Sequence, residues 1–148
     1  MKRYRPLRSP PARAIDFFAC LSCITEIALS KRILAVDDSV AMRRMVYLTL
    51  KSNGYDVAQA CDGIEALELS RNTVVDLVLT DLHMPRMDGI SLIRALRNQP
   101  AYEFVPMLVL ATESDTDQKA EGKRAGATGW LVKPFDPAQL LATIARVL

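Results

Sequence analysis

The chain has 148 residues, of which 50% are hydrophobic and 24% are charged, and its formal net charge is +2. This length and composition predict one compact domain with a real core, and they exclude a disordered or a fibrous chain. The positive charge is concentrated in residues 1–30, so the nearly neutral remainder has no basic field of the kind that drives nucleic-acid binding.

Residues 1–30 form an N-terminal extension that we expect to be disordered or loosely docked. Residues 14–30 are mostly apolar, so the alternative is that they form a signal peptide or a membrane anchor. This stretch contains Asp16 and Glu26, and it is shorter than the roughly 20 residues of a spanning helix. A further hypothesis is that translation starts at Leu29 from a near-cognate codon, so that the extension is not made.

The three cysteines, Cys20, Cys23 and Cys61, are an odd number that does not suit a disulfide framework. Cys20 and Cys23 form a C-x-x-C pair, which raises redox or zinc chemistry as an alternative. The pair lacks a second C-x-x-C, a partnering histidine and a preceding strand, so we interpret these cysteines as incidental. A reducing, cytoplasmic location is therefore expected.

From residue 31 onward, apolar runs with strand character alternate with stretches of helical periodicity. Strands are expected at residues 32–36, 55–60, 76–80, 106–111 and 130–132. Helices are expected at residues 39–52, 64–71 and 137–148, and after the capping residue Asp88. A further helix at residues 116–125 contains Gly122 and little apolar surface, so we expect it to be the least stable. This alternation predicts an α/β domain with a parallel sheet covered by helices on both faces.

Apolar spacing also indicates how these elements pack. The residues that share a helix face are Ala41, Met45 and Leu48 in the first helix, Ile90, Ile93 and Leu96 in the helix after Asp88, and Leu140, Ile144 and Val147 in the last. The continuous apolar runs at residues 77–79 and 107–110 predict central strands that are buried on both sides.

Polar side chains follow four of the expected strands at the point where each strand ends. Asp37 and Asp38 follow the first strand, Asp81 the third, Thr112 the fourth and Lys133 the fifth. In a doubly wound sheet the carboxyl ends of the strands lie at one edge, where ligands bind. Three carboxylates face one lysine there, and Mg2+ would correct this imbalance with the oxygen ligands that it prefers. The sequence therefore predicts a metal-assisted phosphate site, with Asp81 as a nucleophile that forms a labile acyl phosphate.

Four motifs resemble the receiver domain of two-component response regulators: VDDS, DLHMPRMDG, LAT and VKPF, at residues 36–39, 81–89, 110–112 and 132–135. The resemblance covers residues 31–148, and on this basis we expect no output domain. It implies a single domain with the flavodoxin-like fold, a doubly wound sheet of five parallel strands in the order 2-1-3-4-5 with five helices.

The resemblance also implies the roles of the site residues. Asp81 is expected to accept the phosphoryl group, with Mg2+ held by Asp81, Asp38 and the backbone carbonyl of His83. Asp37 is expected to reach the metal largely through water. Thr112 and Lys133 are expected to contact the phosphoryl group, and the family has a cis bond at the position of Lys133 and Pro134.

Three positions depart from the family pattern or leave two interpretations open. Trp130 occupies the position of the switch aromatic, usually Tyr or Phe, and the alternative is a large residue that fills the sheet edge. His83 stands where the family tunes its dephosphorylation rate, and the alternative is a solvated loop histidine. Glu113 replaces a small residue, and it could repel anionic phosphodonors or point into water.

These features favour a stand-alone response regulator that takes its phosphoryl group from a sensor histidine kinase and then changes its affinity for a downstream protein. The stretches at residues 30–46 and 123–140 look most like chemotaxis regulators, whose target is the flagellar motor switch or a related motility complex. We expect a monomer that contacts neither nucleic acid nor membrane, with a phosphatase as a further partner. Its only catalysis would be its own phosphorylation and dephosphorylation.

Three other interpretations remain open. The chain could be a phosphorelay intermediate, or a binding module that works without phosphorylation. A phosphatase of the haloacid dehalogenase type also forms an aspartyl phosphate, but it needs a second acid where this chain has His83.

Overall fold

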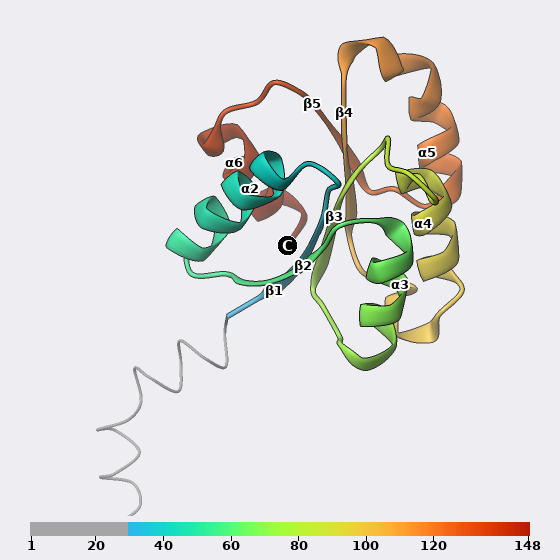
Figure 1. Ribbon diagram of the computed structural model, residues 1–148, viewed down its shortest axis with the longest axis horizontal. Coiled ribbons are helices and arrows are strands. Elements are labelled where there is room, and N and C mark those ends of the chain that lie inside the picture. The colour runs from blue at the N-terminus through green and yellow to red at the C-terminus, as the bar shows by residue number, and fades with distance from the viewer. Residues whose placement is uncertain (1–29) are drawn as a thin grey trace, which may run out of the picture. The chain divides into compact units, whose positions relative to one another are not determined.

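The computed structural model describes residues 30–148, without the side chains of Glu113 and Ser114. The expectations for residues 1–29, which concern the extension, the C-x-x-C pair, the anchor and the alternative start, lie outside the described residues. Residues Lys31–Leu148 form one unit in which strands and helices alternate (Figure 1). Among the described helices, none combines the length and the apolar character that crossing a membrane requires.

Five parallel strands form one sheet in the order β2-β1-β3-β4-β5. They are β1 (Arg32–Val36), β2 (Asp56–Ala60), β3 (Leu77–Asp81), β4 (Met107–Ala111) and β5 (Gly129–Val132). The α-helices between and after them are α2 (Val40–Ser52), α3 (Gly63–Asn72), α4 (Gly89–Arg97), α5 (Lys119–Ala125) and α6 (Pro137–Val147). This arrangement confirms the predicted flavodoxin-like α/β fold and its strand order.

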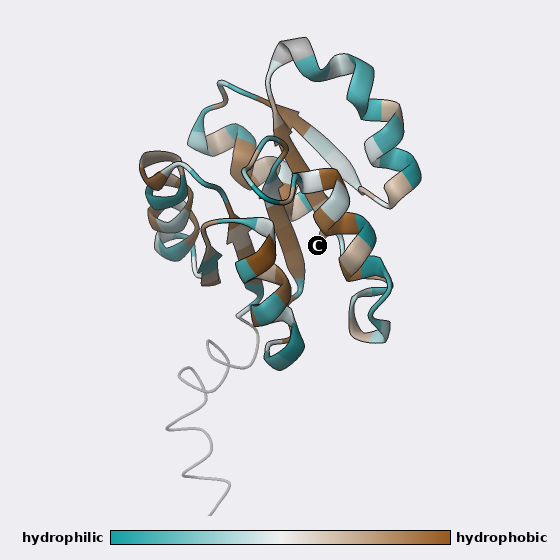
Figure 2. Cartoon of the chain, turned by 45° about the vertical axis from the view of Figure 1, so that its right-hand side comes forward, coloured by the Kyte–Doolittle hydropathy of each residue, from teal (hydrophilic) through white to brown (hydrophobic). Residues whose placement is uncertain are grey.

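Helices cover both faces of the sheet, with α2 and α6 on one face and α3, α4 and α5 on the other (Figure 1). The alternation of side chains along a strand supplies both layers of the core. Ile33 and Ala35 of β1 pack with α2 and α6, whereas Leu34 and Val36 belong to the cluster under α3 and α4. The central strands are accordingly mostly hydrophobic, whereas the helices carry many polar residues (Figure 2).

The central strands β3 and β4 are buried along their whole length, which confirms the prediction from their apolar runs. In β3 this burial includes Thr80 and Asp81, the two polar residues at its carboxyl end. Since a buried carboxylate is costly without partners, the end of β3 is where a functional site is expected.

The packing face predicted for the first helix was correct for Met45, which packs against the core, and wrong for Ala41 and Leu48. Leu48 is 51% exposed and Ala41 is also exposed, whereas Val46 and Leu50 are buried and Met42 packs beside them. The core stripe therefore runs at positions 42, 46 and 50, rotated from the predicted one around the same helix. The predicted core positions of α4 and α6 are confirmed, with Ile93 and Ile144 fully buried.

The segment predicted as one weak helix at residues 116–125 is divided into a 3-10 helix, η2 (Glu113–Gln118), and the seven-residue α5. Gly122 is the buried residue of α5. A Cβ atom at this position would lie 2.8 Å from Cζ3 of Trp130, so the glycine makes room for the indole ring. The low stability expected of this segment remains a prediction.

Candidate functional site

Acidic side chains from β1 and β3 meet at the carboxyl edge of the sheet. Asp37 and Asp38 follow β1 directly, and Asp81 is the last residue of β3. One carboxylate oxygen of each of these three residues lies within 4.8 Å of the others. Asp37 and Asp81 are buried and Asp38 is exposed, so the cluster opens to solvent on the side of Asp38.

Lys133 brings the positive charge that the sequence predicted at this edge. Its Nζ donates a hydrogen bond of 2.9 Å to Oδ1 of Asp81 and lies 3.8 Å from Oδ2 of Asp37. The bond between Lys133 and Pro134 is cis, as the resemblance implied. The amide of Leu82 also donates to Oδ1 of Asp81, at 3.0 Å. These two donors fix the orientation of the Asp81 carboxylate.

Asp37 has one satisfied and one unsatisfied oxygen. Its Oδ1 accepts a hydrogen bond of 2.8 Å from the amide of Ser39, whereas Oδ2 is buried without a hydrogen-bond partner among the described residues. Burial raises the pKa of Asp37, and the neighbouring carboxylates of Asp81 and Asp38 raise it further, against the opposing effects of the Ser39 amide and Lys133. A buried carboxylate oxygen without a donor, beside two further carboxylates, fits a hard divalent cation.

Asp37→Asn should stabilise the metal-free domain at neutral pH by about 1 kcal/mol, because it removes a buried charge that repels Asp81. The pKa of Asp37 is higher in the folded state than its ordinary value of 3.8. The protonated Asp37 side chain therefore contributes its full stabilisation below pH 3.8, and this contribution is lost as the pH rises through the pKa of the folded state. The advantage of the variant should therefore be absent below pH 3.8 and present at neutral pH. Urea unfolding at both pH values, without metal, measures it.

The matched control for this measurement is Asp38→Asn, which removes an exposed carboxylate from the same cluster. Its effect on stability should be smaller, because an exposed charge keeps most of its hydration. If Asp37→Asn were less stable than the unchanged protein at neutral pH, the buried charge would not be the cost that we infer.

An open cavity of about 460 Å³ adjoins the acidic cluster. It is lined by Asp38, His83, Met84, Pro85 and Asp88, which come from the ends of β1 and β3 and from the loop before α4. The cavity gives a small anionic ligand access to the carboxylates from solvent. His83, whose carbonyl was the predicted fourth metal ligand, lies in the same lining as Asp38.

Asp115 joins two of the predicted residues, and the interpretation of the sequence had missed it. Its Oδ2 accepts hydrogen bonds from the hydroxyl of Thr112 at 2.8 Å and from the Thr112 amide at 2.9 Å. Its Oδ1 lies 2.7 Å from Nε2 of His83. The bonds from His83 and from the Thr112 amide and hydroxyl lower the pKa of Asp115 to about 2. The T-x-x-D spacing typical of a capping box is the signal that could have revealed it.

The model of the response regulator receiver domain family matches residues 33–145, which is most of the chain. The chain belongs to this family. It is the same family whose motifs the sequence resembles. In this member of the family, one edge of the sheet carries the acidic cluster, the lysine bonded to Asp81 and the threonine at the end of β4.

Solved receiver structures agree with this assignment. The chemotaxis response regulator CheY4 of Vibrio cholerae is 48% identical with a TM-score of 0.77, and the match covers 80% of this chain and 99% of that one. The receiver domain of the sensor histidine kinase PA1611 from Pseudomonas aeruginosa PAO1 is 30% identical with a TM-score of 0.73, over 79% and 96% of the two chains. That structure is described with a magnesium ion coordinated in its active site cleft.

Curated relatives include longer regulators. The response regulator MprA of Mycobacterium sp. (strain KMS) is 41% identical over 117 residues, which is 79% of this chain and 50% of that protein. The chain thus spans about half the length of the curated relatives that it matches.

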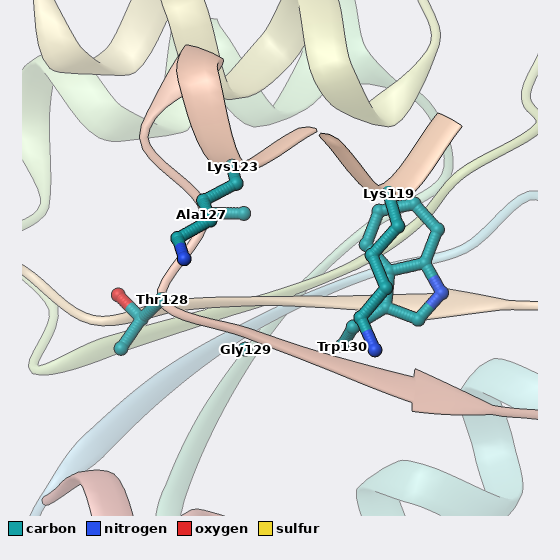
Figure 3. Close-up of a pocket in the computed structure, with 6 residues that line it drawn as sticks. All are labelled: Lys119, Lys123, Ala127, Thr128, Gly129 and Trp130. Atoms are coloured by element: carbon teal, nitrogen blue, oxygen red, sulfur yellow. The ribbon is translucent and has the colours of Figure 1, made fainter. Parts of the chain in front are cut away.

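In this receiver domain Trp130 lies apart from the cavity beside Asp38. It lines a second cavity, of about 210 Å³, with Lys119, Lys123, Ala127, Thr128 and Gly129. Figure 3 shows Lys119 and Trp130 at the same end of this cavity. The indole packs partly against the core, and its Nε1 is buried without a hydrogen-bond partner among the described residues. A switch role for Trp130 remains a prediction.

The loop between β3 and α4 of the receiver domain is tightly held. The amide of Gly89 donates to the carbonyl of Leu82 at 2.8 Å, and Arg86 has a φ of 72° and forms an ion pair with Asp62. Asp62 also accepts a hydrogen bond from the Glu65 amide as the N-cap of α3. This ion pair therefore links the loop to the start of α3.

Proposed function

We propose that this receiver domain is a phosphorylation switch in which Asp81 takes a phosphoryl group from the phosphohistidine of a sensor histidine kinase. The observation that carries the proposal is the hydrogen bond from Lys133 to a buried aspartate within a cluster of three carboxylates. Such an arrangement provides an attacking oxygen, a cationic clamp and ligands for a metal, which phosphoryl transfer requires.

The hydrogen bonds of Asp81 suggest which of its oxygens reacts. Oδ1 accepts from Lys133 and from the Leu82 amide, so Oδ2 is the expected nucleophile. Its attack forms the new oxygen–phosphorus bond while the nitrogen–phosphorus bond to the kinase histidine breaks, and the departing imidazole keeps that electron pair and is protonated. Attack of water on phosphorus then breaks the oxygen–phosphorus bond, releases inorganic phosphate and restores the carboxylate. This self-phosphorylation and self-dephosphorylation is the only catalysis that we propose.

The residues of the cluster suit Mg2+, held by Asp38 and Asp81 directly, by the carbonyl of His83, and by Asp37 largely through water. The ion, when bound, would neutralise charge on the phosphoryl oxygens. Lys133, which donates to Oδ1 of Asp81, would also contact the phosphoryl group.

Asp38→Asn should weaken Mg2+ binding by about tenfold or more, and Asp37→Asn by only about threefold, since an amide in place of Asp37 can still hold a water. The exposed position of Asp38 suits a direct ligand. Calorimetric titration with Mg2+ measures both affinities. Equal losses in the two variants would contradict the ranking.

Phosphoryl acceptance is tested with the unchanged protein, Mg2+ and a small phosphodonor, resolved on a phosphate-affinity gel. We expect a slower-moving species that does not form when a chelator is present during the incubation. Emission of Trp130, the only tryptophan, followed during addition of beryllofluoride, reports separately on the aromatic switch. The absence of any phosphorylated species would count against the proposed function, and an unchanged emission would count only against the role of Trp130.

For the output we propose chemotaxis, acting on the flagellar motor switch or another motility complex in the cytoplasm. The similarity to CheY4, a chemotaxis response regulator matched over 99% of its length, supports this assignment. The switch is proposed to act as a monomer, without contact to nucleic acid or membrane, and with a phosphatase as a further partner. Binding to a motor-switch protein should tighten at least fivefold with beryllofluoride, and no change would reject the chemotaxis output.

A second candidate output is transcription. The longer curated relatives, of which this chain spans about half, include one named as a DNA-binding response regulator, MtrA. The mass of the native protein distinguishes the candidates, because a chain of about twice this length would favour the transcriptional output. A phosphorelay intermediate would instead pass its phosphoryl group on to a second histidine. An unphosphorylated binding module is the weaker alternative, because Asp37, Asp38, Asp81, Thr112 and Lys133 are all intact.

A further inference from the structure

The hydroxyl of Thr112 is held by a carboxylate that belongs to neither the acidic cluster nor the lysine clamp. Asp115 lies in η2, one turn after the end of β4, and its side chain is only 7% exposed. It accepts the Thr112 hydroxyl and amide on Oδ2, while Oδ1 faces His83 of the loop after β3. Asp115 thus spans the ends of two neighbouring strands.

We propose that Asp115 is a positioning residue that holds Thr112 in the unphosphorylated state and must release its hydroxyl when Asp81 is phosphorylated. The proposal rests on the proposed function, in which Thr112 contacts the phosphoryl group. The proposal adds that Asp115 competes with the phosphoryl group for the hydroxyl of Thr112.

The opposition follows from the chemistry of the hydroxyl. Thr112 has a single O–H proton, so its hydroxyl cannot donate at the same time to Asp115 and to a phosphoryl oxygen. Hydrogen bonds to an ionised acceptor are stronger than neutral ones, so the bond to Asp115 is a substantial competitor. On phosphorylation the Thr112 hydroxyl must therefore leave the Asp115 carboxylate and donate to a phosphoryl oxygen instead.

Two further contacts keep the Asp115 carboxylate in place. The Thr112 amide donates to the same oxygen as the hydroxyl, and this bond closes the capping box of η2. His83 approaches the other oxygen from the β3 side. Because both oxygens are engaged, the carboxylate cannot rotate away without losing contacts. We infer that it sets the balance between the two positions of the Thr112 hydroxyl.

The test is the affinity for beryllofluoride in the presence of Mg2+, measured by calorimetry on the unchanged protein and on Asp115→Ala. Removal of the competing acceptor should tighten binding about tenfold, the factor that corresponds to roughly 1.4 kcal/mol. Asp115→Asn keeps the shape of the side chain and should tighten binding by a smaller factor, about threefold, since a neutral amide oxygen is a weaker acceptor. This second variant decides the matter if Asp115→Ala does not fold.

Asp115→Ala also removes a negative charge near the site, which by itself would tighten the binding of an anion such as beryllofluoride. A control variant must therefore remove a nearby charge without touching Thr112. Asp117 is an exposed acid of the same 3-10 helix, and Asp117→Ala should leave the affinity within about twofold of the unchanged protein. Equal tightening in Asp117→Ala and Asp115→Ala would overturn the proposal in favour of simple repulsion.

The decisive arm is a double-mutant cycle with Thr112→Ala. If Asp115 acts through Thr112, Asp115→Ala should give no tightening once the hydroxyl is absent. The same tenfold gain in both backgrounds would overturn the proposal. Unchanged affinity in Asp115→Ala would also overturn it, while beryllofluoride binding by the unchanged protein would leave the proposed function intact. Failure of the unchanged protein to bind beryllofluoride at all would overturn both.

Discussion

Asp81→Asn should abolish phosphoryl acceptance and leave the fold intact. An amide oxygen is too weak a nucleophile to attack a phosphoryl donor, so at least a hundredfold loss is expected from an exchange that changes hardly any volume. The Asn side chain can still accept the hydrogen bonds of Lys133 and the Leu82 amide on its oxygen, as Oδ1 of Asp81 does. A phosphate-affinity gel after incubation with Mg2+ and a small phosphodonor measures the loss.

The matched control is Asp76→Asn, because Asp76 directly precedes β3 and accepts a hydrogen bond from the Arg32 amide at the opposite edge of the sheet. This variant should accept the phosphoryl group at the unchanged rate. Thermal unfolding should show that Asp81→Asn is at least as stable as the unchanged protein, since it removes one of the two buried carboxylates of the acidic cluster. A phosphorylated species of Asp81→Asn would place the acceptor elsewhere.

The position of the acidic cluster followed from the sequence because strand polarity is a strong constraint. Once β1 and β3 are parallel and adjacent, the residues after Val36 and at Asp81 must lie at the same edge. The apolar runs that identify buried strands are local, and the strand order that makes β1 and β3 neighbours was expected from the family resemblance. The fold and the carboxylates of the site were therefore predictable.

Features that depend on distant contacts were not predictable in the same way. The stripe of α2 was placed wrongly at Leu48 because Leu48 and Leu50 are both apolar, and only the packing against α6 and the sheet decides which of them is buried. Asp115 was missed because its bond to His83 joins residues 32 positions apart, at the end of a loop. Its nearer bond to Thr112 left a visible signal in the capping spacing.

Without a metal, the carboxylates that form the site lower the stability of the fold. Asp37 and Asp81 are both buried, and among residues 30–148 Lys133 is the cation within ion-pair distance of both. One cation cannot compensate two buried carboxylates and the exposed Asp38 beside them. Substitutions that relieve the charge should therefore raise stability while they lower metal affinity, as expected for Asp37→Asn. This opposition is typical of residues kept for function rather than for folding.

Gly89→Ala should destabilise the domain by about 3 kcal/mol, which lowers the melting temperature by roughly 10 °C. A Cβ atom at this position would lie 2.3 Å from the carbonyl oxygen of Asp81 and 3.1 Å from Cα of Leu82. Both neighbours are backbone atoms at the end of β3, where the proposed nucleophile Asp81 lies, so neither can turn aside as a side chain would. Thermal unfolding measures the loss, and Mg2+ titration of the folded variant should show weaker binding because the strand end must shift.

Gly63→Ala is the control that isolates this cause. Its Cβ would lie 2.8 Å from Cγ of Met87, which is also too close for an ordinary contact, but the obstacle is a flexible side chain rather than a backbone. Met87 can adopt another rotamer, so the cost should stay below about 1 kcal/mol and Mg2+ binding should be unchanged. Equal destabilisation by the two variants would mean that crowding in general, and not contact with the backbone of Asp81, explains the loss. A larger effect of Gly89→Ala on both measurements would show that the close approach of α4 to β3 positions the carboxylate.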